Sequence, residues 1–147
     1  MQNITVRAYK TNQGTLPFYI FLIPSDDLSY ISYVIRRSED QKKGIQRIAS
    51  TERISEIASF INESKDVVFP NNLVINFDKE VLFRPDRDKL KEGELIIPKK
   101  KHTAQIIDGQ HRLFGLGAAK KNIPTIVVAF SGLDLIQRAK IFLTINS

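Results

Sequence analysis

The sequence contains no cysteine. This absence excludes disulfide bonds, thiolate nucleophiles and zinc sites with cysteine ligands. It also fits a reducing compartment, because disulfides persist mainly where the surroundings are oxidising. We therefore expect a cytoplasmic protein.

Long hydrophobic runs are absent as well. The longest apolar stretches, Leu16 to Pro24 and Ile123 to Phe130, are far shorter than the roughly 20 residues that a transmembrane helix needs. The N-terminus does not have the layout of a signal peptide. No glycine-rich Walker loop is present, and no metal-ligand spacing stands out. We expect a soluble protein with no membrane partner and no dedicated metal site.

Basic residues outnumber acidic residues. The chain has 147 residues with 22 Lys and Arg against 16 Asp and Glu, which gives a formal net charge of +6. This balance favours anionic partners, so we expect DNA or nucleotides to bind. Many small basic domains bind neither, and charge alone leaves that alternative open. The length and a hydrophobic content of 42% fit one ordinary globular domain.

The first part of the chain predicts a β-hairpin followed by a helix. Residues Ile4 to Lys10 alternate between apolar and polar side chains, as in a half-buried strand. A turn signal at Asn12 to Gly14 precedes a second apolar strand, Pro17 to Ile23, and we expect a hairpin with a longer loop. A helix capped by Ser25 or Asp26 follows. Its expected inner face consists of Leu28, Ile31, Val34 and Ile35.

An amphipathic helix is predicted after Ser50, its expected N-cap. Its apolar residues recur at i, i+3, i+4 and i+7, and they are Ile54, Ile57, Ala58 and Ile61.

Strands and helices alternate in the rest of the chain. The expected strands are Leu73 to Phe77, Leu95 to Ile97, Ala104 to Ile107 and Ile123 to Phe130. The last one is continuously apolar, which predicts burial on both faces. Helices are expected after Gly109 and after Ser131 or Asp134. The inner face of the final helix is expected to hold Leu135, Ile136, Ala139, Phe142 and Leu143. This order predicts an α/β (α+β) fold in which helices flank a mixed β-sheet.

The turn from Asp108 to Arg112 joins an apolar strand to a helix and is the candidate site. Gly109 permits backbone angles that a side chain would forbid, and it lets a ligand approach closely. The first N–H groups of a helix and its dipole together favour an anion. Arg112 can bind a phosphate through two parallel hydrogen bonds, and His111 can donate another. In the alternative interpretation, Arg112 only pairs with Asp108 while His111 is solvated.

Three further assignments accompany this turn. Asp108 is expected to cap the helix through the N–H of Gln110 or His111, with a metal or a ribose hydroxyl as alternative ligands. Gln110 either binds a base or phosphate or faces solvent. The basic run before the motif strand is a candidate for nucleic-acid contact or a solvated turn. It consists of Lys99, Lys100 and Lys101.

Asp108-Gly109-Gln110-His111-Arg112 is identical to the motif that gives the DGQHR domain its name. Three other stretches are similar to segments of that family in the same order, and they are Gly44 to Arg47 with Arg53 to Ala58, Phe69 to Asn71, and Phe142 to Ser147. On these motifs the chain resembles the DGQHR-domain family, which includes DndB-like proteins linked to DNA phosphorothioation and phage defence. We expect residues 1–147 to form a single DGQHR domain that corresponds to the N-terminal part of those longer proteins.

This resemblance implies a fold similar to ParB and sulfiredoxin, in which a strand, a basic turn and a helix bind the phosphates of a nucleotide. It implies that His111 and Arg112 contact phosphate and that Gly109 and Gln110 line the turn. Gln46 and Arg47 are implied to lie near the same pocket. Gln110 stands where sulfiredoxin has its reactive cysteine, so that sulfur chemistry is not carried over. ParB has consecutive arginines there, so its nucleotide preference is not carried over either.

Three functions follow. The favoured one is a nucleotide- or phosphate-binding regulatory domain of a DNA-binding protein linked to DNA sulfur modification or phage defence, such as a transcriptional regulator. Its ligand would be ATP or CTP, and its partners DNA, other proteins of the modification system or a second copy of the chain. The favoured regulatory domain is expected not to be an enzyme, or to hydrolyse nucleoside triphosphates only weakly. The first alternative is a nucleotide hydrolase or nuclease that uses the same turn. Mg²⁺ would then need ligands among Asp108, Asp78, Glu80, Asp86 and Asp88, of which the last four fit a solvated charged stretch better. The second alternative is a protein-interaction domain without a ligand.

Overall fold

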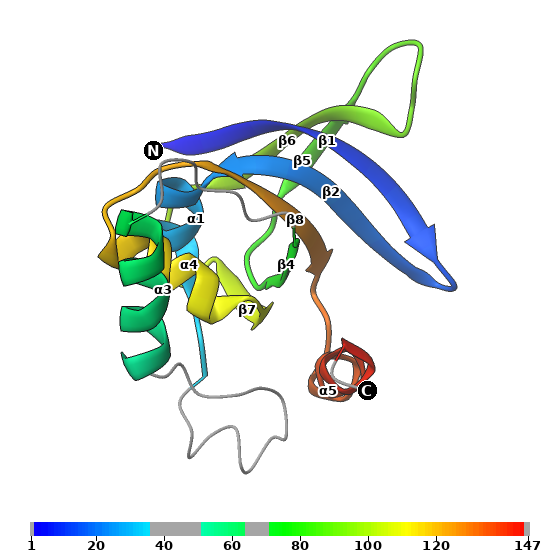
Figure 1. Ribbon diagram of the computed structural model, residues 1–147. Helices are drawn as coiled ribbons and strands as arrows, with labels where there is room; N and C mark the ends of the chain where they lie inside the picture. The colour runs from blue at the N-terminus through cyan, green and yellow to red at the C-terminus, as the bar shows by residue number, and fades with distance from the viewer. Residues whose placement is uncertain (1, 36–50, 64–70, 146–147) are drawn as a thin grey trace.

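The computed structural model describes residues 2–35, 51–63 and 71–145. Eight strands and four helices lie in this part of the chain (Figure 1). In chain order they are β1 (Asn3–Gln13), β2 (Leu16–Pro24), α1 (Ser25–Ile31), β3 (Ser32–Tyr33), α3 (Thr51–Glu63), β4 (Leu73–Phe77), β5 (Leu82–Pro85), β6 (Glu92–Pro98), β7 (Ala104–Asp108), α4 (Gln110–Ala118), β8 (Pro124–Ser131) and α5 (Leu135–Ile145).

The strands form one mixed sheet, as predicted. Their order is β3-β7-β4-β8-β2-β1-β6-β5. β3 runs parallel to β7 and β4 runs parallel to β8, while the other neighbours are antiparallel. β5 was not predicted, because it lies in a mixed, charged stretch from Val81 to Glu94 without alternation. Its pairing with β6 makes it a strand.

The predicted N-terminal hairpin is confirmed, but the prediction that its loop is longer than two residues is wrong. Gln13 pairs with Leu16, so only Gly14 and Thr15 lie in the loop. Gly14 has a φ of 58°, a conformation that glycine adopts readily and that tight hairpin turns require.

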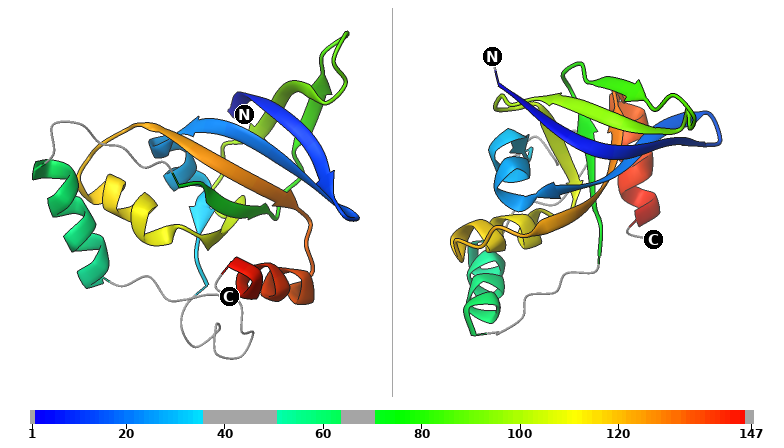
Figure 2. Two further views of the ribbon diagram at one scale, coloured as in Figure 1. Left: turned by 45° about the vertical axis from the view of Figure 1, so that its right-hand side comes forward. Right: turned by 90° about the horizontal axis from the view of Figure 1, so that it is seen from above.

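Helices cover both faces of the sheet (Figures 1 and 2). α1 and α4 contribute Leu28, Ile31 and Leu113 to the main core on one face. α5 lies on the other face, where Ile141 and Phe142 pack against a smaller cluster. The buried residues of that cluster are Phe18, Val74, Ile107, Phe130 and Leu133.

α3 forms an outer layer against α4, and its predicted amphipathic pattern is confirmed. Ala58 and Ile61 are buried in a cluster with Leu116 of α4. Gly115 allows the two helices to approach, because a Cβ there would lie 2.4 Å from Cγ2 of Ile57. This close contact brings α3 beside α4. The predicted N-cap, Ser50, lies outside the described residues.

The first helix is shorter than predicted. It ends at Ile31 because Ser32 and Tyr33 pair with β7 as strand β3. Its N-cap residue is Pro24, and no side chain caps it. The Ser25 hydroxyl oxygen instead accepts a hydrogen bond from the backbone N–H of Ile123 at 3.0 Å.

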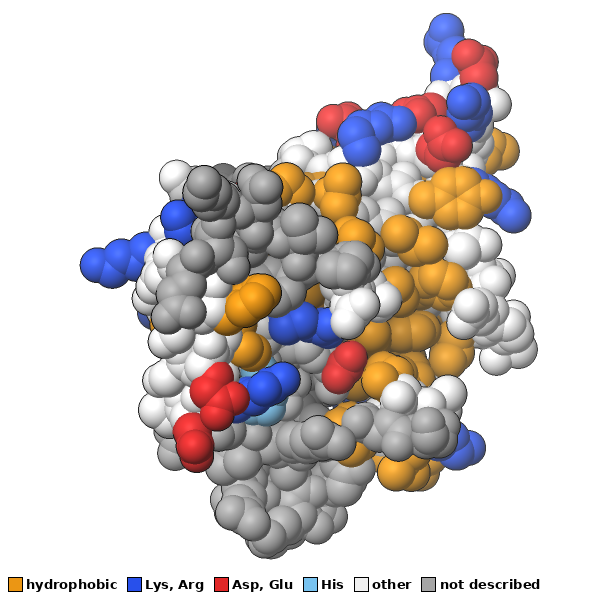
Figure 3. Space-filling view, viewed as in Figure 1, with side chains coloured by type: hydrophobic (Ala, Val, Ile, Leu, Met, Phe, Trp, Pro, Cys, Tyr) orange, Lys and Arg blue, Asp and Glu red, His pale blue; other side chains and the backbone are white. Residues whose placement is uncertain are grey.

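The burial of β8 also differs from the prediction. Thr125, Val127 and Ala129 are buried, but Ile126 on the opposite face is 36% exposed. It pairs with Leu22 of β2, which is 57% exposed. Hydrophobic side chains remain visible over these strands because α5 covers only part of this face (Figure 3).

Asp134 starts α5 as predicted. Its carboxylate accepts a hydrogen bond from the N–H of Gln137, and the Gln137 side chain accepts one from the N–H of Asp134. This reciprocal arrangement is a capping box.

The predicted inner face of α5 is only partly right, because Phe142 packs against the smaller cluster but three of the other residues are exposed. Leu135, Ile136 and Leu143 are 47%, 67% and 62% exposed, and the helix has no buried residue. Arg138, four positions before Phe142, is also turned to the sheet, and its guanidinium donates a hydrogen bond to the side-chain oxygen of the buried Gln105. Burying this amide without a partner would be costly.

Candidate functional site

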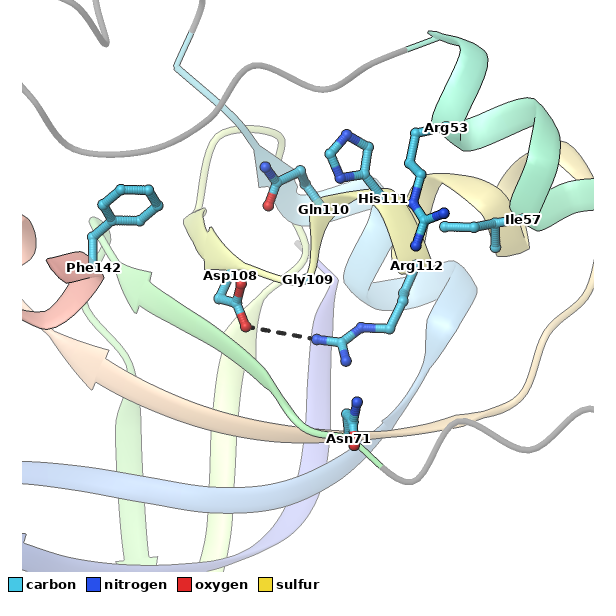
Figure 4. Close-up of a pocket in the computed structure, with 9 residues that line it drawn as sticks. All are labelled: Arg53, Ile57, Asn71, Asp108, Gly109, Gln110, His111, Arg112 and Phe142. Carbon is cyan, nitrogen blue, oxygen red and sulfur yellow. Dashed lines mark ion pairs between the residues drawn. The ribbon is translucent and has the colours of Figure 1, made fainter. Parts of the chain in front are cut away.

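The five motif residues from Asp108 to Arg112, which we call the phosphate turn, line one pocket of about 350 Å³ (Figure 4). β7 is buried up to Ile107, and its last residue, Asp108, leads into Gly109 and α4. The other residues that line the pocket are Arg53, Ile57, Asn71 and Phe142. The sheet, α3, α4 and α5 thus meet at this turn, and open space lies over it.

Gly109 is required by the backbone and by its neighbours. Its φ is 101°, which an L side chain rarely adopts. A Cβ at this position would lie 2.7 Å from Cγ of Leu73 and 2.9 Å from Nη2 of Arg112. The turn therefore packs tightly against the start of β4, and this packing alone explains the glycine.

Arg112 is held at the edge of the pocket. Its Nη2 donates a hydrogen bond to the carbonyl oxygen of Asn72 at 3.1 Å. The same nitrogen lies 3.7 Å from Oδ2 of Asp108, an ion pair that is too long for a hydrogen bond. The pairing of Asp108 with Arg112 is therefore confirmed. A guanidinium has five N–H donors, more than these two contacts use.

Asp108 does not cap the helix, so this prediction is wrong. Gly109 is the N-cap residue of α4, and among the described residues no side chain, Asp108 included, makes a capping hydrogen bond. The carboxylate lies one residue too early for that role and turns toward Arg112 (Figure 4). The start of α4, with its partial positive charge, consequently borders the pocket without a carboxylate cap.

Gln110 and His111 line the same pocket from the first turn of α4. Gln110 is only 5% exposed, which excludes the prediction that it simply faces solvent. His111 is half-buried and lies beside Arg53 in Figure 4.

Four pocket residues were not predicted as site residues. Arg53 and Ile57 lie four positions apart on α3 and share a helix face. Asn71 precedes β4, and Phe142 comes from α5. The helical spacing was visible in the sequence, but the docking of α3 on α4 was not.

Arg53 adds a second guanidinium to the pocket. Its side chain is 61% exposed, and its Nη1 lies 3.4 Å from Oε2 of Glu56. Among the described residues that line the pocket, two arginines and one histidine accompany one carboxylate, Asp108. This arrangement can attract and hold an anion.

The basic run is not part of this pocket. Lys99, Lys100 and Lys101 precede β7, whereas the phosphate turn follows it, so about 16 Å of extended chain separates them. Lys99 lies 3.6 Å from Asp27, and the ammonium groups of Lys99 and Lys101 lie 5.9 Å from the ring centre of Tyr30. Gln46 and Arg47 lie outside the described residues.

A second polar cluster lies at the other end of β7. Asp78 accepts hydrogen bonds from Tyr33 and from Arg138 of α5. Burial and the hydrogen bond to Asp78 raise the pKa of Tyr33 to about 12. Because Phe77 pairs with Ala104 at the start of β7, this cluster holds the first part of α5 at the end of β7 opposite to the phosphate turn.

The carboxylates considered as Mg²⁺ ligands are not gathered at the turn. Asp78 belongs to the cluster around Arg138, and Asp86 accepts two hydrogen bonds from Arg7, which lower the pKa of Asp86. Within residues 2–35, 51–63 and 71–145, no group of three or more His, Asp or Glu side chains could hold a metal ion. None of the helices in this same part of the chain is long and apolar enough to cross a membrane.

Comparison with known proteins gives one match. The model of the DndB family, which is described as DNA-sulfur modification-associated, matches residues 6–146. The match spans the phosphate turn and nearly all of the sheet. No curated protein and no solved structure matches the chain.

Proposed function

This chain belongs to the DndB family of DNA-sulfur modification-associated proteins, and from this premise we propose that it is a phosphate- or nucleotide-binding regulatory domain. The observation that supports the proposal is the pocket over the phosphate turn. It combines the start of a helix with Arg112, Arg53 and His111. Each of these elements favours a negatively charged ligand.

The two arginines differ in a way that suits a phosphate. Arg112 is 20% exposed and fixed by Asn72 and Asp108, so its guanidinium is already positioned before a ligand arrives. Arg53 is 61% exposed and reaches the same pocket from α3. Partial burial strengthens the attraction of Arg112 for a phosphate, because less water screens it.

Calorimetric titration with tripolyphosphate, ATP and CTP tests this proposal. We expect binding to the wild type and a loss of about tenfold to 100-fold in Arg112→Ala, the range for a hydrogen bond to a charged group. Arg84→Ala is the matched control, since it removes the same charge from the β5–β6 hairpin, which projects away from α3 and α4 (Figures 1 and 2). Equal affinity in both variants, or no binding at all, would contradict the proposal.

Asp108→Asn provides a test with the opposite sign. The Asp108 carboxylate lies 3.7 Å from Arg112 and competes with an anionic ligand for it. Removing this charge should tighten tripolyphosphate binding severalfold. If the ion pair between Asp108 and Arg112 has only a structural role, the affinity for tripolyphosphate should not change.

We further propose that the domain acts with DNA, as the family description and the net charge of +6 suggest. Because phosphate contacts release counterions, the affinity for duplex DNA should fall linearly with the logarithm of the salt concentration. If the domain is regulatory, nucleotide must change DNA affinity, and DNA must change nucleotide affinity by the same factor. A flat salt response argues against the DNA contact, and a missing coupling argues against regulation.

Several finer points of this proposal stay predictions. They are a role as a transcriptional regulator in phosphorothioation or phage defence, cytoplasmic localisation, and a similarity of fold to ParB and sulfiredoxin. Self-association and contacts with other proteins of the modification system belong here too. Weak Mg²⁺-dependent hydrolysis of ATP or CTP at the same turn is the remaining enzymatic prediction, and release of phosphate that is lost in Asp108→Ala would support it.

A further inference from the structure

The pocket over the phosphate turn continues into a second hollow along α3. This second pocket has a volume of about 410 Å³ and shares Arg53, Ile57, Asn71 and Arg112 with the first. Glu56 and Phe60 complete its lining. A ligand with its charged end beside Arg112 can therefore extend along α3.

One face of α3 changes from cationic to apolar along this path. Arg53, Ile57 and Phe60 stand at i, i+4 and i+7, so they share a face over about 10 Å of helix axis. Ile57 is wedged against Gly115 of α4, which keeps it in place. We call Ile57 and Phe60 the apolar shelf.

The outer part of this shelf is exposed. α3 buries Ala58 and Ile61 against α4, whereas Phe60 is 59% exposed and lines the second pocket together with Arg112. Exposed aromatic rings next to basic side chains are the usual surface for stacking a nucleobase. Between the shelf and Arg112, Glu56 offers acceptors and Asn71 offers both donors and acceptors for a sugar or a base edge.

Resting on the proposed function, we infer that the ligand of the phosphate turn is a nucleoside polyphosphate whose base lies on the apolar shelf. Its phosphates contact Arg112, His111 and Arg53, and its sugar passes Asn71. An inorganic phosphate chain can make the contacts to the arginines and the histidine but not those of the sugar and the base. The nucleoside must therefore add affinity.

Calorimetry with tripolyphosphate, ATP and CTP separates the two contributions. Phe60→Ala should lower the affinity for whichever of ATP and CTP binds more tightly by about fivefold to 100-fold, the range for one stacked base. The affinity for tripolyphosphate should not change. Phe60→Tyr should retain nucleotide binding because it keeps the ring. Leu90→Ala, which truncates a side chain that is 74% exposed in the chain between β5 and β6, is the control and should change neither.

Nuclear magnetic resonance can detect the stacked base even if Phe60→Ala changes the affinity only slightly. A base on the shelf shifts the methyl resonances of Ile57 through its ring current, so ATP or CTP should move them and tripolyphosphate should not. Equal affinity for nucleotide and tripolyphosphate, with no effect of Phe60→Ala and no shift at Ile57, overturns this inference but leaves the phosphate site in place. If tripolyphosphate does not bind, or binds independently of Arg112, the proposed function is overturned as well.

Discussion

Two glycines of α4 predict opposite effects of the same substitution. A Cβ at Gly115 would lie 2.4 Å from Cγ2 and 2.8 Å from Cβ of Ile57, whereas a Cβ at Gly117 would meet nothing within 4 Å. Cβ of Ile57 is joined directly to the backbone of α3, so the helix itself must move. Overpacking of this kind costs about 1–3 kcal/mol.

The comparison between the two variants isolates this cost. Replacing glycine by alanine inside a helix stabilises it by roughly 0.5–1 kcal/mol, and this gain is common to both sites. Gly117→Ala should therefore be neutral or stabilising, and Gly115→Ala should be less stable than Gly117→Ala by about 1–3 kcal/mol. For a chain of this length the gap corresponds to roughly 3–12 °C in melting temperature.

Thermal and urea unfolding of the two variants, with nucleotide titrations of each, test this reasoning. Gly115→Ala should also weaken nucleotide binding, because α3 carries Arg53 and Ile57 away from Arg112 when it moves. If both variants gain stability equally, the close α3–α4 contact does not exist in solution. If Gly115→Ala is destabilised but binds nucleotide normally, α3 does not form a wall of the binding pocket.

Three further predictions concern the turn and α5. Gly109→Ala should destabilise the protein by roughly 1–3 kcal/mol in urea unfolding, because its φ of 101° strains any side chain and Leu73 lies in the way; an unchanged midpoint would contradict this. Arg138→Ala should cost about 1–3 kcal/mol and speed hydrogen exchange in α5, since it removes the guanidinium that donates to the buried oxygen of Gln105; unchanged α5 exchange would show that the helix is held by other contacts. Tyr33 should ionise near pH 12 in an ultraviolet titration, and Tyr33→Phe should remove that step. Since the unfolded pKa is about 10, Tyr33 stabilises the fold below pH 10 and loses this contribution as the pH rises toward 12, and an ordinary titration near 10 would contradict the burial of Tyr33 together with its hydrogen bond to Asp78.

The local predictions that held depend on short-range patterns. The spacing of Ile57, Ala58 and Ile61 predicts α3, and the turn after Ile107 predicts a strand followed by a helix. These patterns follow from the periods of the helix and the strand, which neighbouring residues determine by themselves.

Two of the predictions that failed concern which face of an element is covered. α5 is apolar on more than one side, so its periodicity alone does not choose the inner face. The choice is made by Arg138, whose guanidinium contacts Gln105 and Asp78, 33 and 60 positions away in the sequence. In β8 the apolar run predicts full burial, yet Ile126 is exposed because none of the helices in the described ranges covers that part of the sheet.

The amino-acid sequence by itself determined the chemistry of the turn: a glycine, a histidine and an arginine at the start of a helix, directly after a buried strand. Only the tertiary structure decided what surrounds it. The contact at Gly115 brings Arg53 into the pocket that Arg112 lines, across 59 positions of sequence. Such long-range neighbours depend on how all the buried faces fit together, and no local pattern encodes that fit.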